Sequence, residues 1–277
     1  MGFRINTNVA SIAAQRSLGV TNRESESNLS KMSTGTRIHK ASDDAAGLEI
    51  SEKMKANIRS MKQADRNAND GISMVQTAEG GLNEVSSILT RMRELAIQTA
   101  SDTVGDPERN FTNMEYQNLK QELDRISQVT EFNGQKLLDG NGKKYDFQIG
   151  VNNNEFQDRI SYDSAVVNSR MDQMGVAELV VSTKEASQES VGKLDAAIER
   201  TSGYRAFLGA IQNRLVSTSN NLQVTTENLS AANSRIRDVD YAEATATQAK
   251  NSILSSAGTS VLAQANMSSQ NALKLIG

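Results

Sequence analysis

The sequence predicts a mainly α protein, an elongated antiparallel bundle or coiled coil of long helices with a small β-hairpin region in the middle of the chain. Three observations support this: two long apolar stripes at helical spacing, a single proline in 277 residues, and a short centre rich in glycine and asparagine. Proline interrupts helices, so its near absence permits unusually long ones. A helix over residues 54–99 would be ~69 Å long, whereas a compact chain of this size is roughly 50 Å across. We therefore expect an elongated molecule.

The two apolar stripes lie far apart in the sequence, and their apolar residues recur mostly at spacings of three and four. This pattern places them on one side of a helix that needs a partner helix. We predict the first helix over residues 48–100 and the second over about 190–240. The expected seam between them consists of Met54, Ile58, Ile72, Val75, Leu89, Leu208, Ile211, Leu215, Leu222, Leu229 and Ile236.

Between the long helices, the sequence predicts a third helix and a short β region. The Asp-Pro-Glu sequence at 106–108 combines a capping residue, a first-turn proline and an acidic residue at the positive helix end. This helix ends before the Asn-Gly turn signal at 133–134. Residues 140–182 contain alternating apolar residues between turn-forming segments, so we expect hairpins there, with a further short strand over 176–182.

Composition limits the possible classes of function. The 30 basic and 33 acidic residues give a net charge of −3, which does not favour nucleic-acid binding. Cysteine is absent, which excludes thiolate catalysis, disulfides and cysteine-based metal sites. Residues 1–19 lack the apolar core of a secretory signal, and no apolar run suggests membrane insertion. These features fit either a cytosolic protein or one exported without a cleaved signal.

Few side chains suggest chemistry. His39 is the only histidine and cannot build a His-rich metal site, so we interpret it as a solvated loop residue. Asp43 and Asp44 resemble a carboxylate pair for acid–base work, but a helix N-terminal cap is the preferred interpretation. The Gly-Asn-Gly sequence at 140–142 lacks the ending of a phosphate-binding loop and is interpreted as a turn. We predict no enzyme activity, no metal and no cofactor.

The two ends of the chain, residues 1–32 and 241–277, are too small to bury their own apolar side chains. Ordering such a segment costs conformational entropy that a lone helix does not recover. We therefore expect the ends to order only against each other or against neighbouring molecules. The residues expected to pack in this inner region are Ile5, Val9, Ile12, Ile253, Leu254, Val261, Leu262, Leu273 and Ile276.

Several segments resemble bacterial flagellin, in the order in which that family carries them. They include Ile-Asn-Thr-Asn at the N-terminus, Arg-Met-Arg-Glu-Leu-Ala-Ile-Gln in the first long helix and Leu-Gly-Ala-Ile-Gln-Asn-Arg-Leu in the second. The matching segments are residues 5–8, 36–38, 43–48, 91–98, 132–134, 208–215, 234–236 and 257–266. Only a short segment separates the helical blocks, so the chain looks like a minimal flagellin without large outer domains.

The resemblance implies a subunit that polymerises into the flagellar filament for swimming. It implies an inner, channel-lining domain of residues 1–40 and 241–277, and an outer long-helix domain of residues 41–190 and 191–240. Two alternatives stay open: the hook–filament junction protein, a relative with similar ends, and a coiled-coil binding module that does not polymerise.

The resemblance also implies partners and a location. The protein would be exported to the extracellular filament without a cleaved signal and would bind other copies of itself in a homopolymer. Its C-terminal tail would bind an export chaperone, and the filament would meet cap and hook-junction proteins. The pattern read by the vertebrate toll-like flagellin receptor falls on Arg91, Leu95 and Glu115, a surface that also contacts the neighbouring subunit. Arg91 and Arg93 alone would be ordinary solvated charges, but the resemblance favours an interface.

Overall fold

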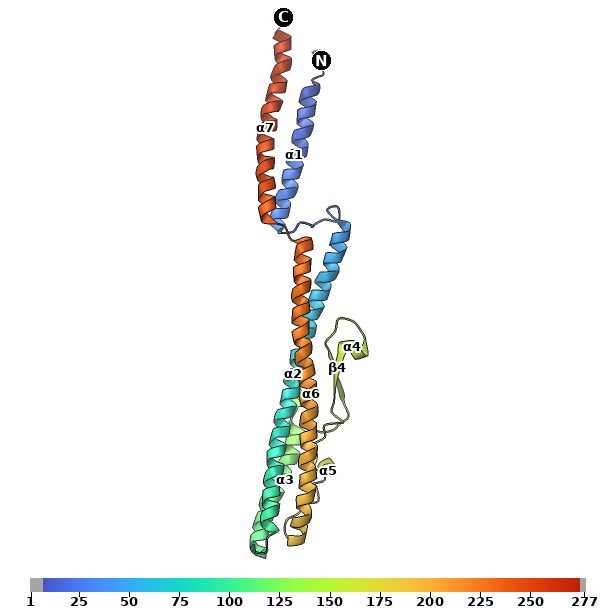
Figure 1. Ribbon diagram of the computed structural model, residues 1–277, viewed down its shortest axis with the longest axis vertical. Helices are drawn as coiled ribbons and strands as arrows, with labels where there is room; N and C mark the ends of the chain where they lie inside the picture. The colour runs from blue at the N-terminus through green and yellow to red at the C-terminus, as the bar shows by residue number, and fades with distance from the viewer. Residues whose placement is uncertain (1–6, 275–277) are drawn as a thin grey trace. The chain divides into compact units, whose positions relative to one another are not determined.

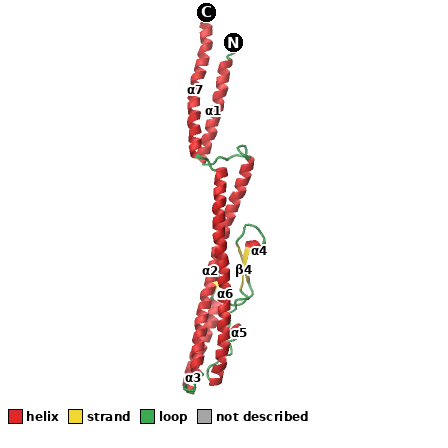
Figure 2. Ribbon diagram, viewed as in Figure 1, coloured by secondary structure: helices red, strands yellow, loops and turns green. Residues whose placement is uncertain are grey.

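Helices form most of the protein in the computed structural model, which describes the backbone of residues 7–274 and the side chains of residues 7–267 (Figures 1 and 2). The predicted mainly α fold, with long helices and a small β-hairpin region in the middle of the chain, is confirmed. The long helices are α1 (Val9–Thr34), α2 (Ala45–Thr99), α3 (Asp106–Val129), α6 (Lys184–Arg237) and α7 (Tyr241–Lys274).

The chain divides into two compact units. We call residues 1–56 with 228–277 the terminal unit, and residues 57–227 the central unit. Both divisions fall inside helices, one in α2 and the other in α6. The domain boundaries near residues 40 and 241 stay a prediction.

In the central unit, α2 and α6 run antiparallel and share an aliphatic core. Ser219 donates a hydrogen bond to Asp65, and Thr99 donates one to Ser187 at 2.9 Å, so the partners advance in opposite directions along the two helices. One cluster of buried side chains lies between these helices and the hairpins. A second lies between α2, α3, α6 and residues 174–181. The core is therefore closed by elements that lie between α2 and α6 in the sequence.

Two hairpins follow α3. The first pairs β1 (Glu131–Phe132) with β2 (Gln135–Lys136), and its turn places both central residues at positive φ, 51° and 74°. An Asn-Gly pair suits this turn because these residues tolerate positive φ. The second pairs β3 (Lys144–Gln148) with β4 (Arg159–Asp163). Two single-turn helices, α4 (Glu155–Asp158) and α5 (Met171–Met174), lie in this region.

Gly81 permits the close approach of the first hairpin to α2. A Cβ at this position would lie 2.7 Å from Thr130 Oγ1 and 2.8 Å from Leu138 Cδ1. Such distances are too short for a Cβ atom. Glycine at this position therefore lowers the stability of the helix but allows the close contact.

The strand expected over residues 176–182 is wrong. This segment is irregular, and its backbone bonds to side chains of a neighbouring helix rather than to another strand. Lys120 donates to the carbonyl of Ala177 at 2.8 Å, and the amide of Val181 donates to Asn113 Oδ1 at 3.1 Å. The apolar alternation that suggests a strand instead reflects side chains buried in the second core cluster.

In the terminal unit, α1 and α7 lie side by side and run antiparallel (Figure 1). The segment after α1 is tied to the segment before α7 by two backbone bonds, from Arg37 N to Arg237 O at 2.6 Å and from Val239 N to Gly35 O at 3.1 Å. Beyond this point, Asp44 Oδ1 accepts from Gly47 N at 2.9 Å, which confirms the predicted cap of α2.

The prediction of a solvated His39 is wrong. Its side chain is only 19% exposed, because the loop from residue 39 to residue 43 folds back on itself. Asp43 accepts hydrogen bonds from the backbone N–H groups of His39 and Lys40 at 3.2 and 3.0 Å, and His39 Nδ1 lies 3.1 Å from the same carboxylate. Asp43 therefore stabilises a turn.

Candidate interaction surfaces

Small polar side chains join α1 to α7. Asn28 Nδ2 donates to the carbonyl of Ala244 at 2.7 Å, and Gln248 Nε2 donates to Ser25 Oγ at 2.8 Å. Further bonds along the same line join Ser255 to Asn22, Ser11 to Asn266, and Asn8 to Ala265. The contact line thus consists mainly of alanine, serine, asparagine and glutamine. These small residues let the two helices approach closely, and Leu18 of α1 lies against Gly258 of α7, where an added Cβ would be 3.2 Å from Leu18 Cδ1.

Most of the large apolar residues of α1 and α7 are exposed, away from this contact. Of the residues expected to pack in the inner region, Leu262 is half-buried, whereas the following are exposed: Val9, Ile12, Ile253, Leu254 and Val261. Val20, Leu29 and Met267 are exposed as well. Ile5, Ile276 and the side chain of Leu273 lie outside the described residues. We expected these large side chains to pack on one another. Among the described residues, one chain leaves most of them exposed, because small polar residues occupy most of the contact between α1 and α7.

The seam between α2 and α6 is closed over only part of its length. Its buried members are Val75, Leu89, Leu208, Ile211, Leu215 and Leu222. Its half-buried members are Met54, Ile58, Ile72, Leu229 and Ile236. Four of these five lie at the ends of the stripes, beyond the residues that α3 and the hairpins cover. Both apolar stripes are continuous in the sequence, so the sequence does not indicate where the seam changes from buried to half-buried.

Arg91 lies at the centre of an exposed network of charges on α2 and α3. Its Nη1 donates to Glu94 Oε2 at 3.0 Å, and its Nη2 donates to Glu115 Oε1 at 2.9 Å. These two carboxylates raise the pKa of Arg91, Glu94 most strongly. Nearby, Arg93 pairs with Asp195 of α6. The structure thus brings together two of the three residues of the expected interface pattern, Arg91 and Glu115.

Leu95, the third residue of that pattern, does not lie on the surface. Its side chain is 2% exposed and belongs to the second core cluster, with Met92 and Ala96. Residues 92, 95 and 96 share one face of a helix, and in α2 that face points to the core. The expectation that Leu95 lies on the surface is therefore wrong for the folded chain, and its part in the interface pattern stays a prediction.

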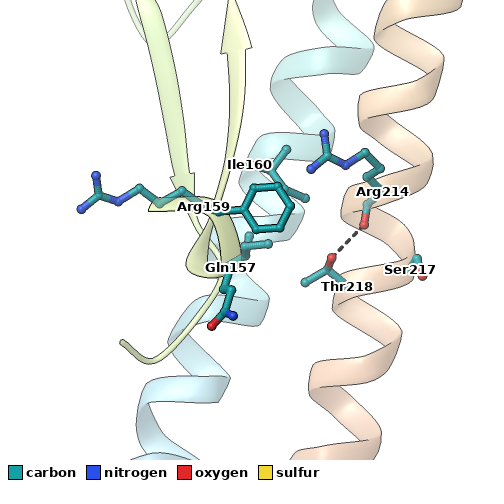
Figure 3. Close-up of a pocket in the computed structure, with 8 residues that line it drawn as sticks. Gln157, Arg159, Ile160, Arg214, Ser217 and Thr218 are labelled. Carbon is teal, nitrogen blue, oxygen red and sulfur yellow. Dashed lines mark hydrogen bonds between the residues drawn. The ribbon is translucent and has the colours of Figure 1, made fainter. Parts of the chain in front are cut away.

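A hollow of about 290 Å³ lies where the second hairpin approaches α6, and the sequence analysis missed it (Figure 3). Ile149 and Ile160 contribute buried apolar side chains, and Arg214 and Thr218 line it from α6. Phe156 of α4 also lines the hollow and is 91% exposed. The sequence signal was available: a lone phenylalanine in an otherwise polar loop.

The described residues contain no group of three metal-binding side chains. Within the same part of the chain, no helix is both long enough and apolar enough to span a membrane. What the structure does offer is exposed apolar residues on paired helices. Such a surface is typical of a helical protein that associates with other chains.

The class of protein follows from comparison with known families. The N-terminal helical region of bacterial flagellin matches residues 5–143, and the C-terminal helical region of bacterial flagellin matches residues 191–276. The chain is 42% identical to a flagellin of Halalkalibacterium halodurans over 272 residues, covering 98% of this chain and 99% of the relative. It is 41% identical to a flagellin of Bacillus subtilis over 310 residues, covering 99% of this chain and 100% of the relative. The chain therefore belongs to the bacterial flagellin family.

Solved structures share this fold. A crystal structure of Bacillus cereus flagellin is 29% identical and covers 61% of this chain and 94% of its own, with a TM-score of 0.50. A putative flagellar hook-associated protein from Vibrio parahaemolyticus shares the fold, with a TM-score of 0.59 at 12% identity, covering 71% of this chain and 100% of its own.

Proposed function

We infer that the chain polymerises through the outward-facing apolar side chains of α1 and α7. As a flagellin, it is a structural subunit of the flagellar filament, whose general role is swimming motility and whose location is extracellular. The observation that carries the assembly mechanism is the exposed apolar surface on helices whose mutual contact is polar. Other copies of the same chain would cover this surface.

The energetics favour assembly of this kind. Burying one large aliphatic side chain contributes about 1.5–3 kcal/mol. The exposed aliphatic side chains of α1 and α7 together represent a large gain that one chain alone does not realise. The polar bonds between the two helices hold the pair in place, so each added copy meets a preformed surface.

We propose that the exposed Arg91–Glu115 pair is part of a second subunit contact, and that a vertebrate toll-like flagellin receptor reads the same surface. The support is its exposure and its cross-link between α2 and α3 by two hydrogen bonds, from Arg91 Nε and Nη2. Leu95 would act here by holding α2 against the core.

The remaining partners follow from membership of the flagellin family. The C-terminal tail would bind an export chaperone, and the filament would contact cap and hook-junction proteins. Export would proceed without a cleaved signal. The sequence suits passage in an unfolded state, because it contains no cysteine and one proline, hence no disulfide and little slow isomerisation.

Assembly tests the proposal directly. We expect the purified protein to form filaments in electron micrographs when short filament seeds are added. Removal of residues 241–277 should abolish filament growth while the circular dichroism of the central helices persists. Filaments formed by the truncated chain would contradict the role given to α7. A full-length chain that stays in the supernatant with seeds would favour the binding-module alternative.

A further inference from the structure

Phe156 marks an uncovered apolar site in the central unit. At 91% exposure it is the most exposed of the large apolar side chains among the described residues. It lines the hollow beside α6 together with the buried Ile149 and Ile160. An aromatic ring in water beside an apolar wall is a site that a partner side chain would cover.

The hollow also contains a cation to which no described residue is bonded. Figure 3 shows the guanidinium of Arg214 directed from α6 toward the hairpin, whereas Arg159 points away from α6. Arg159 is bonded to Gln148 Oε1 at 3.2 Å and to Asn153. Among the described residues, no carboxylate or carbonyl accepts a bond from the Arg214 guanidinium. The hollow therefore fits an apolar side chain accompanied by a carboxylate.

The first turns of α3 present that combination. Phe111 and Met114 are 72% and 64% exposed, which makes them the most exposed large apolar residues of the central unit after Phe156. Glu108 is exposed, and no described residue bonds to its carboxylate. Spacings of three residues place Glu108, Phe111 and Met114 on neighbouring positions of one helix surface. We call these three residues the α3 patch.

One chain cannot bring its own patch into its own hollow. The beginning of α3 lies beside the beginning of α6, because Asn113 Oδ1 accepts from Val181 N at 3.1 Å, close before Lys184. From residue 184 to residue 214, α6 rises ~45 Å. The patch and the hollow therefore lie far apart on the same unit. A contact between two different surfaces of identical chains leaves one of each free at the ends, so it continues into an open polymer unless it closes into a ring.

We propose that the hollow formed by Phe156, Ile149, Ile160 and Arg214 receives the α3 patch of a second copy of this chain. Phe111 and Met114 cover Phe156 and the two isoleucines, and the Glu108 carboxylate accepts hydrogen bonds from Arg214. This contact rests on the proposed function, because it is one of the contacts between subunits of the polymer. Its two sides are the hollow of one chain and the α3 patch of the next.

A charge exchange tests the pairing. Arg214→Glu and Glu108→Arg each place like charges together, so each should raise the critical concentration for filament growth about tenfold, equivalent to ~1.4 kcal/mol. The double variant restores opposite charges and should return to within about threefold of the original chain. The matched control joins Glu108→Arg with Arg59→Glu, a reversal at an exposed cation outside the hollow, and should not recover. Thermal melting of the monomers shows whether each variant folds.

Cross-linking gives a second readout that is independent of charge. Because the chain has no cysteine, Phe156→Cys and Phe111→Cys chains can be mixed, assembled and oxidised with diamide. A disulfide-linked dimer containing one chain of each kind is expected in filaments and not in unassembled protein. Val166→Cys mixed with Phe111→Cys is the control and should stay monomeric.

The outcomes separate the two claims. Single charge variants that assemble like the original chain, a double variant without recovery, or absence of the mixed disulfide in filaments would each overturn this contact while leaving the filament function intact. A full-length original chain that never assembles would overturn the proposed function and this contact with it.

Discussion

The terminal and central units use paired helices in opposite ways. In the central unit, α2 and α6 turn their aliphatic side chains toward each other, and α3 and the hairpins complete the core. In the terminal unit, α1 and α7 meet through hydrogen-bonded polar side chains and leave their large aliphatic residues exposed. The first arrangement closes its core within one chain, and in our proposal the second is covered by other chains.

This contrast shows that burial depends on available cover as well as on apolar residues. A two-helix pair has no third element to close over an apolar face, so apolar residues on its outer sides stay in water. In the central unit, α3 and residues 130–181 supply that third element. The units should therefore respond differently to the loss of an aliphatic side chain.

The largest effect on the folded monomer is expected in the central core. Leu208→Ala removes a fully buried side chain from the first core cluster. Such a change destabilises by about 2–5 kcal/mol, because it loses burial and leaves a cavity. Chemical denaturation followed by circular dichroism measures this. A loss of less than ~0.5 kcal/mol would mean that the central core is not closed within one chain.

The matched change in the terminal unit is Ile253→Ala. This side chain is 69% exposed, so the monomer should lose no more than ~0.5 kcal/mol of stability. Assembly should suffer instead, with a critical concentration raised roughly tenfold, because the apolar area is buried only in the polymer. Sedimentation of filaments against protein concentration gives the value. If unfolding and assembly shifted together, the distinction between the units would fail.

A smaller effect is expected from the polar contact between α1 and α7. Asn28→Ala removes the bonds from Nδ2 to Ala244 O and to Gln248 Oε1. The expected loss is about 1 kcal/mol, because folding exchanges bonds with water for bonds within the protein. Faster amide hydrogen exchange along α7 would report it. Gln15→Ala, at an exposed amide on the same helix, is the control and should leave exchange unchanged.

The long helices and their approximate ends could be predicted from the sequence, because apolar periodicity and the helix-start signal at 106–108 depend only on residues close together in the chain. The sequence did not indicate which part of each apolar stripe is buried, because the stripes are buried by α3 and the hairpins, which are distant from much of each stripe in the sequence. It also placed Leu95 on the surface and His39 in solvent, although each is shielded by neighbours that only the fold supplies. The hollow at Phe156 escaped for the same reason, because Ile149 and Arg214 meet only after folding.

The smallest effect tests whether polar contacts hold the terminal unit. The backbone N–H of Lys40, then that of His39, lower the pKa of Asp43 below its usual 3.8, with smaller contributions from the charges of His39 and Lys31. The folded-state pKa thus lies below the unfolded one, so the stabilisation is present above about pH 4 and is lost as the pH falls through the folded-state pKa.

The Asp43→Asn variant should remove this pH dependence. Its amide hydrogen exchange at residues 39–44 should match that of the original chain only in acid. Because these hydrogen bonds lie within a single turn of residues 39–43, the change should be slight, and the stability of the central unit should not be affected. A central unit that melts earlier in Asp43→Asn would show that the two units depend on each other for stability, against the independence that their contrasting packing implies.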